Sequence, residues 1–485
     1  MPLILPGNVG SATAATGYNV ANSLRLNVAS TASLSVNMGT SSNRRIWTFS
    51  IWHKKSTFGG TQNIVGTGGS SDQNHIVYEN SQLTVRHYNG SANDIRVGTN
   101  RQFEDVSAFY HIVVAVDTTQ GTAANRVKIY VNGVQETSFE EATYPDQNYD
   151  WDFFQNGADT YISRRGHNDE SHLDGYIAEV AWLDGTQAAP TAFGEFDSDS
   201  GIWKPKDFKS DVTFGDAGFY LEFKESGTSQ NSSGLGADTS GQTNHFAVNN
   251  LTAVNQSTDT CTNNFATWNS LQPTNATLTE GNLVGASSAS SGHYSGISSI
   301  GVSSGKWYFE CKQTQESTAN EGMIGVIIFD GSNTITALLN PVGRGGGWGM
   351  QDGTRGFSTD SGGSGSTTDN FHAGWTDDDI IGIALDIDNS RVYFSKNGQW
   401  NNSGSWDASS PTTSQTLQNG LGDGTYFFMA GDASGSNNNT WSANFGSPAH
   451  AISSGNTDGN GYGNFEYAVP SGYFSLNTKN LAEYG

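Results

Sequence analysis

The stretch YHIVVAVD at residues 110–117, followed by RVKIYVNG at residues 126–133, decides the fold class. The first stretch is apolar at successive positions, which predicts a central β-strand that is covered on both faces. The second stretch alternates between apolar and polar residues and ends in Asn-Gly, the dipeptide typical of a tight hairpin turn. We therefore expect an antiparallel sheet here.

The same order of elements occurs again in the second half of the chain. IIGIALD at residues 380–386 ends in an aspartate, as the first stretch does, and RVYFSKNG follows at 391–398. Any two hairpins share some features, but here the order and the spacing also match. We therefore predict an all-β protein with two related antiparallel β-sandwiches in tandem. Side chains expected in the two cores are Val114, Ile129, Trp307, Phe309, Ile383 and Leu385.

Composition supports strands and turns and excludes several functions. The 485 residues include 60 glycines and only 14% charged residues, which disfavours long helices. Lys+Arg is 23 against 47 Asp+Glu, a net charge of −24, which argues against nucleic-acid binding and anionic membranes. No apolar run is long enough to insert in a membrane, and the N-terminus lacks the basic start of a secretion signal.

Five parts follow from the changes in composition. They are an N-terminal arm (1–20), a first sandwich (21–225), a Ser/Thr/Asn/Gly-rich linker that partly packs on its neighbours (226–275), a second sandwich (276–447) and a C-terminal tail (448–485). Within the second sandwich, residues 342–370 are rich in Gly, Ser and Thr, which predicts long exposed loops. Cys261 and Cys311 are too few for a disulfide framework, and whether they pair is left open; Cys311 is expected in the core.

Sequence motifs connect each sandwich to a known family. WTFSIWHKKS (47–56), the 110–134 hairpin and LDGYIAEVAWLDGT (173–186) resemble the laminin-G-like and pentraxin branch of the concanavalin A-like jelly-roll sandwiches. SGKWYFECK (304–312), the 380–400 hairpin and WSANFG (441–446) resemble a SPRY domain. Both resemblances imply a concanavalin A-like fold.

The layout of the whole chain resembles virion structural proteins of tailed bacteriophages, especially marine phages. The resemblance rests on GYNVANSLRLN (17–27), the two sandwiches and PSGYFSLNTKNL (470–481). It implies a tail fibre, a knob or a head decoration that assembles in the host cytoplasm. It also implies attachment to other virion proteins through the arm and tail, adhesion to a host-surface glycan or protein, and is compatible with a homo-oligomer.

The sequence argues against an enzyme. Hydrolysis of a glycoside needs two carboxylates about 5–10 Å apart, and no ExDxE strand pattern occurs. Asp386-Ile387-Asp388 is better explained as turn chemistry, and Glu179 and Glu222 are expected to be solvated strand residues. Two alternatives remain, a polysaccharide-degrading tailspike hydrolase and a cellular lectin-like adhesin.

Candidate binding residues lie in the predicted loops. Trp348 and Asp352 stand in a glycine-rich stretch, and Trp400, Asn401 and Trp406 follow a hairpin turn, which predicts a sugar-binding surface. The alternative is that these tryptophans close the ends of the sandwich. The laminin-G resemblance also allows a Ca²⁺ ion at a rim of the first sandwich, near Asp117, Asp169 and Asp174. No other cofactor is expected.

Overall fold

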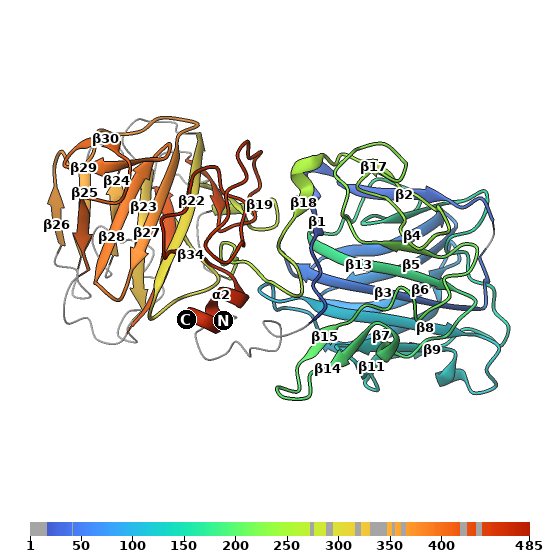
Figure 1. The fold of residues 1–485 in the computed structure, drawn as a ribbon. Coiled ribbons are helices and arrows are strands. Elements are labelled where there is room, and N and C mark those ends of the chain that lie inside the picture. Colours follow the sequence, from blue (N-terminus) through green and yellow to red (C-terminus); the bar gives the residue numbers. More distant parts are fainter. Residues whose placement is uncertain are drawn as a thin grey trace. The chain divides into compact units, whose positions relative to one another are not determined.

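The computed structural model describes residues 17–40, 42–271, 276–287, 294–315, 322–329, 347–351, 355–359, 365–417, 424–432 and 439–485. The chain forms two compact units that divide between Thr262 and Asn263, here called the N-terminal and C-terminal units. Each is built from antiparallel sheets (Figure 1), so the predicted all-β concanavalin A-like fold is confirmed. One α-helix, α2 (Thr478–Tyr484), occurs in the described residues, and none of their helices could cross a membrane.

Two eight-stranded sheets make up most of the N-terminal unit. The first, here the β13 sheet, has the order β10 (Val134–Gln135), β9 (Val127–Val131), β8 (Tyr110–Asp117), β3 (Ile46–Lys55), β13 (Gly175–Asp184), β1 (Ser23–Leu26) and β18 (Gln256–Ser257), with β16 (Phe219–Leu221) paired to β13. The second, here the β5 sheet, has the order β11 (Phe139–Thr143), β7 (Asn93–Gln102), β6 (Gln82–Tyr88), β5 (Asp72–Glu79), β4 (Thr61–Gly69), β12 (Asp159–Ile162), β2 (Ser33–Asn37) and β17 (Ala247–Asn249). A small hairpin of β14 (Gly194–Phe196) and β15 (Trp203–Pro205) is separate from both.

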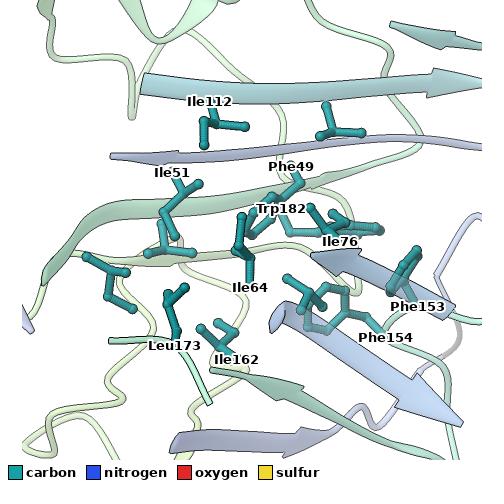
Figure 2. Close-up of a cluster of buried hydrophobic side chains, with 14 of the residues drawn as sticks. Phe49, Ile51, Ile64, Ile76, Ile112, Phe153, Phe154, Ile162, Leu173 and Trp182 are labelled. Carbon is teal, nitrogen blue, oxygen red and sulfur yellow. The ribbon is translucent and has the colours of Figure 1, made fainter. Parts of the chain in front are cut away.

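The core of this unit lies between the two sheets. Alternate residues of each strand face inward, so Phe49 and Ile51 of β3 meet residues such as Ile64 of β4 and Ile76 of β5 in one buried cluster (Figure 2). The predicted core residues Val114 and Ile129 belong to it.

The C-terminal unit has a ten-stranded and a six-stranded sheet in its described residues. The larger sheet has the order β19 (Ala276–Thr279), β20 (Val284–Ser287), β33 (Thr440–Asn444), β22 (Lys306–Gln315), β27 (Ile380–Asp386), β28 (Arg391–Lys396), β29 (Gln399–Asn402) and β30 (Ser405–Ala408), with β31 (Ser414–Thr416) on β28 and β34 (Phe474–Ser475) on β22. The smaller has the order β21 (Tyr294–Ile297), β32 (Thr425–Asp432), β23 (Gly322–Phe329), β24 (Gly347–Gln351), β25 (Arg355–Thr359) and β26 (Gly365–Thr368). The remaining predicted core residues, Trp307, Phe309, Ile383 and Leu385, are all buried in the cluster between these sheets.

The segment predicted as a linker contributes residues to both units. Leu235, Phe246 and Leu251 are buried in the core of the N-terminal unit, and β17 and β18 each extend one of its sheets. Trp268 is buried in the C-terminal unit. The packing that the prediction allowed for this segment rests on a few well-placed apolar residues, while its Ser, Thr, Asn and Gly supply the turns.

The structure also bears on the expectations for the tail, the stretch 342–370 and the two cysteines. The tail packs on its own unit, where β34 pairs with β22 and Leu476 and Leu481 are buried. The stretch 342–370 contains β24, β25 and β26, so the expectation of loops throughout is wrong. Residues 1–16 of the predicted arm lie outside the described residues. Cys261 and Cys311 are both free thiols, and Cys311 is buried in its core as expected.

Candidate functional site

The hairpin of β29 and β30 carries one of the predicted tryptophans in a partly exposed position. The indole nitrogen of Trp406 donates a hydrogen bond to the carbonyl of Gly374 at 3.0 Å. Its ring lies 5.6 Å from the ring of His372, which itself stacks on buried Trp375. One side of Trp406 is therefore fixed by the protein, and part of the ring stays accessible.

Asn401 holds this hairpin in place. It is buried, and its amide nitrogen donates to the carbonyl of Phe371 at 2.8 Å. Its amide oxygen accepts from the backbone N–H of Gly404 at 3.3 Å, and its carbonyl accepts from the hydroxyl of Thr412 at 2.8 Å. Asn401 is thus a positioning residue that ties the hairpin to two neighbouring segments.

Other exposed or partly exposed residues lie on this hairpin or next to it. Exposed Asn402 donates to exposed Asp407 at 2.9 Å across the turn, and Phe371 is partly exposed. We call Trp406, Phe371, Asn402 and Asp407 the hairpin surface. Rings that offer an apolar face, beside amide and carboxylate oxygens that accept hydrogen bonds, match the C–H faces and hydroxyl groups of a sugar.

The other two predicted tryptophans are buried. Trp400 packs on the outer face of the larger sheet, in a cluster with Tyr308, Phe465 and Tyr473. Trp348 lies in β24 with no exposed surface and belongs to the core. Neither side chain is accessible to a ligand, so the alternative of a packing role applies to both.

The glycines near Trp348 predict a loop, but in the structure they allow two strands to approach closely. β24 pairs with β23 in a register that sets Trp348 opposite Val326. A Cβ on Gly325 would lie 2.3 Å from the carbonyl oxygen of Trp348, so glycine permits a close approach of two strands here. Asp352 lies outside the described residues.

The three aspartates proposed for Ca²⁺ have separate roles in the structure. Asp117 accepts bonds from the backbone and hydroxyl of Thr119 at 3.0 and 2.6 Å. Asp169 contacts Arg164 and His172, and Asp174 is buried. In the part of the chain that the structure describes, no three His, Cys, Asp or Glu side chains are arranged to hold a metal ion.

The expectation that Glu179 and Glu222 are solvated is wrong, because both side chains are buried. Glu179 faces outward from β13 but is only 3% exposed, and its carboxyl accepts from the hydroxyls of Tyr18 (2.7 Å) and Tyr220. Burial raises the pKa of Glu179 to about 7. Burial also acts to raise the pKa of Glu222, but hydrogen bonds from Lys224 and Thr239 outweigh it and lower that pKa.

Two carboxyls whose pKa values move apart are the signature of an acid–base pair. Here the carboxyl of Glu179 is covered by Tyr18 and is only 3% exposed, so it does not face a surface that a polysaccharide contacts. No local sequence pattern indicates this cover, because Tyr18 and Glu179 are 161 residues apart.

Glu310 in the C-terminal unit is a second buried glutamate. Its carboxyl accepts from the backbone N–H groups of Glu466 (3.0 Å) and Tyr467 (2.9 Å), which belong to the tail. It also accepts from the hydroxyl of Tyr308 (3.0 Å) and the amide of Asn444 (3.2 Å). Burial raises the pKa of Glu310 to about 7 against these four donors.

Comparisons with known proteins agree with the fold. Residues 28–191 match the family described as the concanavalin A-like lectin/glucanases superfamily, which confirms the laminin-G-like fold of the N-terminal unit. No curated protein matches the chain.

Among solved structures, the SPRY domain of human HERC1 is 15% identical, with 36% of this chain and 96% of that chain covered and a TM-score of 0.27. A heptameric SAP-like pentraxin from Limulus polyphemus is 15% identical (32% and 71% covered, TM-score 0.24). A putative carbohydrate binding protein from Bacteroides ovatus is 18% identical (48% and 59% covered, TM-score 0.31).

Proposed function

We propose that the protein is a non-enzymatic adhesion protein whose C-terminal unit binds carbohydrate through the hairpin surface. The observation that carries this proposal is Trp406, a partly exposed indole that is fixed by a hydrogen bond at 3.0 Å, on a hairpin that also carries the exposed Asn402 and Asp407. An immobilised ring loses little conformational entropy when a ligand stacks on it. The match of the N-terminal unit to a superfamily of lectins and glucanases is consistent with a role in carbohydrate recognition.

Charge at the hairpin surface favours an uncharged or amino sugar. Asp407 is the ionisable residue of the hairpin surface, and the whole chain carries a net charge of −24. In the described part of this unit, Lys306, Lys312 and Lys396 each form an ion pair with an aspartate, at 2.8, 2.8 and 3.7 Å. A sulfated sugar or a uronic acid would therefore meet repulsion from the carboxylate of Asp407.

A binding assay with matched glycans tests the proposal. Surface-immobilised neutral, amino and uronic-acid oligosaccharides are compared for wild type and Trp406→Ala. We expect about 3- to 10-fold weaker binding for the variant, as the loss of one aromatic contact predicts. Phe329→Ala is the control, because Phe329 is a 38% exposed aromatic residue on β23, outside the hairpin of β29 and β30. Equal binding of wild type and Trp406→Ala would contradict the site.

The enzyme alternative has its own assay. A tailspike-type hydrolase releases reducing sugar from a polysaccharide that it binds, whereas an adhesion protein leaves the polymer intact. Release above the background of a heat-denatured sample would overturn the non-enzymatic assignment.

We also propose that the protein is a virion structural component on the head or tail surface of a tailed bacteriophage. The support for this is the sequence resemblance of the chain layout, above all at 17–27 and 470–481. The expected result is that the chain sediments with intact particles through a density gradient and is labelled by antibodies on their surface. A chain that remains at the top of the gradient would contradict the proposal.

A further inference from the structure

A short N-terminal segment lies across the outer face of the β13 sheet. We call Gly17–Asn22 the strap. Its apolar anchor is Val20, which is 3% exposed and packs in a cluster with Trp52, Ala178 and Trp203. The backbone N–H of Val20 also donates to the hydroxyl of Thr262 at 3.1 Å.

The polar anchor of the strap is a bond between two side chains. The hydroxyl of Tyr18 donates to Glu179 at 2.7 Å and lies 3.1 Å from the hydroxyl of Tyr220. Glu179 sits at a β-bulge between Ala178 and Ala181 with φ of +50°, a left-handed conformation that a glutamate adopts only when its surroundings enforce it. The bulge thus directs a carboxyl outward to the place that the strap covers.

We propose that the contact between Tyr18 and Glu179 is a pH-dependent switch. The strap is closed, that is, bound to the β13 sheet, while Glu179 is protonated, and it opens by detaching from the sheet when Glu179 ionises. The reason is that the closed strap removes the carboxyl from water, which disfavours its charged form. Opening returns the carboxylate to solvent. The two tyrosine hydroxyls suit the closed state in either protonation state, because a hydroxyl can donate or accept.

The charged and titratable groups around Glu179 set the direction of the effect. They come from the strap (Tyr18), from β16 and the residues after it (Tyr220, Glu222, Lys224) and from the segment before Asn263 (Cys261). Burial is the largest influence and raises the pKa of Glu179, the charge of Glu222 raises it further, and Lys224 and the two hydroxyls lower it. The net result is a pKa of about 7, above the ordinary 4.5.

The sign of the pH dependence follows from these two values. The closed strap holds the proton more tightly than the open one, so acid favours closure. As pH rises between 4.5 and 7, the open fraction increases, and above the closed-state pKa it levels off. From pH 5 to pH 8 the opening equilibrium should rise by at most about 100-fold.

Hydrogen exchange of the strap amides measures this opening. Protection of residues 17–22, corrected for intrinsic exchange, is followed from pH 5 to pH 8 in wild type and Glu179→Gln. We expect protection in wild type to fall with rising pH by up to about 100-fold, and protection in Glu179→Gln to stay constant because its side chain does not titrate. Glu222→Gln, which removes the neighbouring charge and keeps Glu179, should retain a pH dependence.

The reactivity of a cysteine thiol gives a second measurement of strap opening, which does not depend on hydrogen exchange. Cys261 is half-buried and packs against the same cluster as the strap, so its reaction with a disulfide reagent should become faster when the strap opens. Cys311→Ala removes the other thiol. The ratio of wild-type to Glu179→Gln reaction rates cancels the titration of the thiol itself and should rise with pH. Tyr18→Phe, which keeps the ring, should open more readily than wild type at every pH. Constant strap protection in wild type, or an unchanged pH dependence in Glu179→Gln, would overturn the proposal.

Discussion

Glu179 in the N-terminal unit and Glu310 in the C-terminal unit hold terminal segments of the chain by different means. Both are buried on the outer face of a sheet, and burial raises the pKa of each to about 7. Glu179 accepts from two tyrosine hydroxyls, of which one belongs to the strap. Glu310 accepts from four donors, and two of them are main-chain N–H groups of the tail.

The kind of donor decides what each glutamate can do. A hydroxyl can reverse its role when a carboxyl gains or loses a proton, whereas an N–H group can only donate. Main-chain bonds also fix the backbone itself, while a bond to Tyr18 fixes one side chain. Two glutamates with similarly raised pKa values therefore hold their segments differently, one through a side-chain hydroxyl and the other through main-chain N–H groups.

Removing the carboxyl of Glu310 should produce the largest effect. Glu310→Ala leaves the buried N–H groups of Glu466 and Tyr467 without an acceptor, and we expect the C-terminal unit to lose about 3–5 kcal/mol of its free energy of unfolding. Chemical denaturation followed by hydrogen exchange of the tail measures this. Glu225→Ala, at an exposed position, should stay within about 0.5 kcal/mol of wild type. A small loss in Glu310→Ala would show that the tail is held mainly by its apolar contacts.

The free energy of unfolding of the N-terminal unit should depend on pH through Glu179. Because the pKa of Glu179 is raised in the folded protein, its contribution is fully present below pH 4.5 and is lost as pH rises through 7. The difference in unfolding free energy between wild type and Glu179→Gln should change over this window by up to about 3 kcal/mol. Denaturation curves of both proteins at several pH values provide the test. A difference that is flat across the window would mean that Glu179 titrates as it does in the unfolded chain.

Matched tyrosine substitutions should have the smallest effects. Tyr18→Phe and Tyr308→Phe each remove one hydroxyl from a buried glutamate, and each should cost about 1 kcal/mol. The two variants should differ in hydrogen exchange. Tyr18→Phe should expose the strap amides, whereas Tyr308→Phe should leave the tail protected because three donors to Glu310 remain. Similar exposure of both segments would remove the distinction between them.

Local pattern was sufficient to predict the strands and the core. Alternation and the Asn-Gly turns identified the central hairpins, and Val114, Phe309 and Ile383 are buried as expected. These features depend on neighbours in sequence, which a single chain displays directly.

Features that depend on distant contacts were missed. Glu179 looked like a solvated strand residue because its cover, Tyr18, lies far away in the chain. Trp348 looked like a loop residue because the same glycines serve a flexible loop or a close strand pair. At the hairpin surface, Trp406 was foreseen, but Asn401 is a buried positioning residue, and no local signal singled out Phe371 or Asp407.

β17 and β18, which lie in the segment predicted as a linker, should also protect the N-terminal unit from aggregation. β18 pairs with β1 and β17 pairs with β2, and each lies at the end of its sheet. A fragment cut after residue 225 would present β1 and β2 as bare sheet edges, with unpaired N–H and C=O groups that template pairing between molecules. Such a fragment should aggregate, while one that ends at Thr262 should remain monodisperse. Proteolytic cleavage between these two points would convert a stable N-terminal unit into a seed for aggregation.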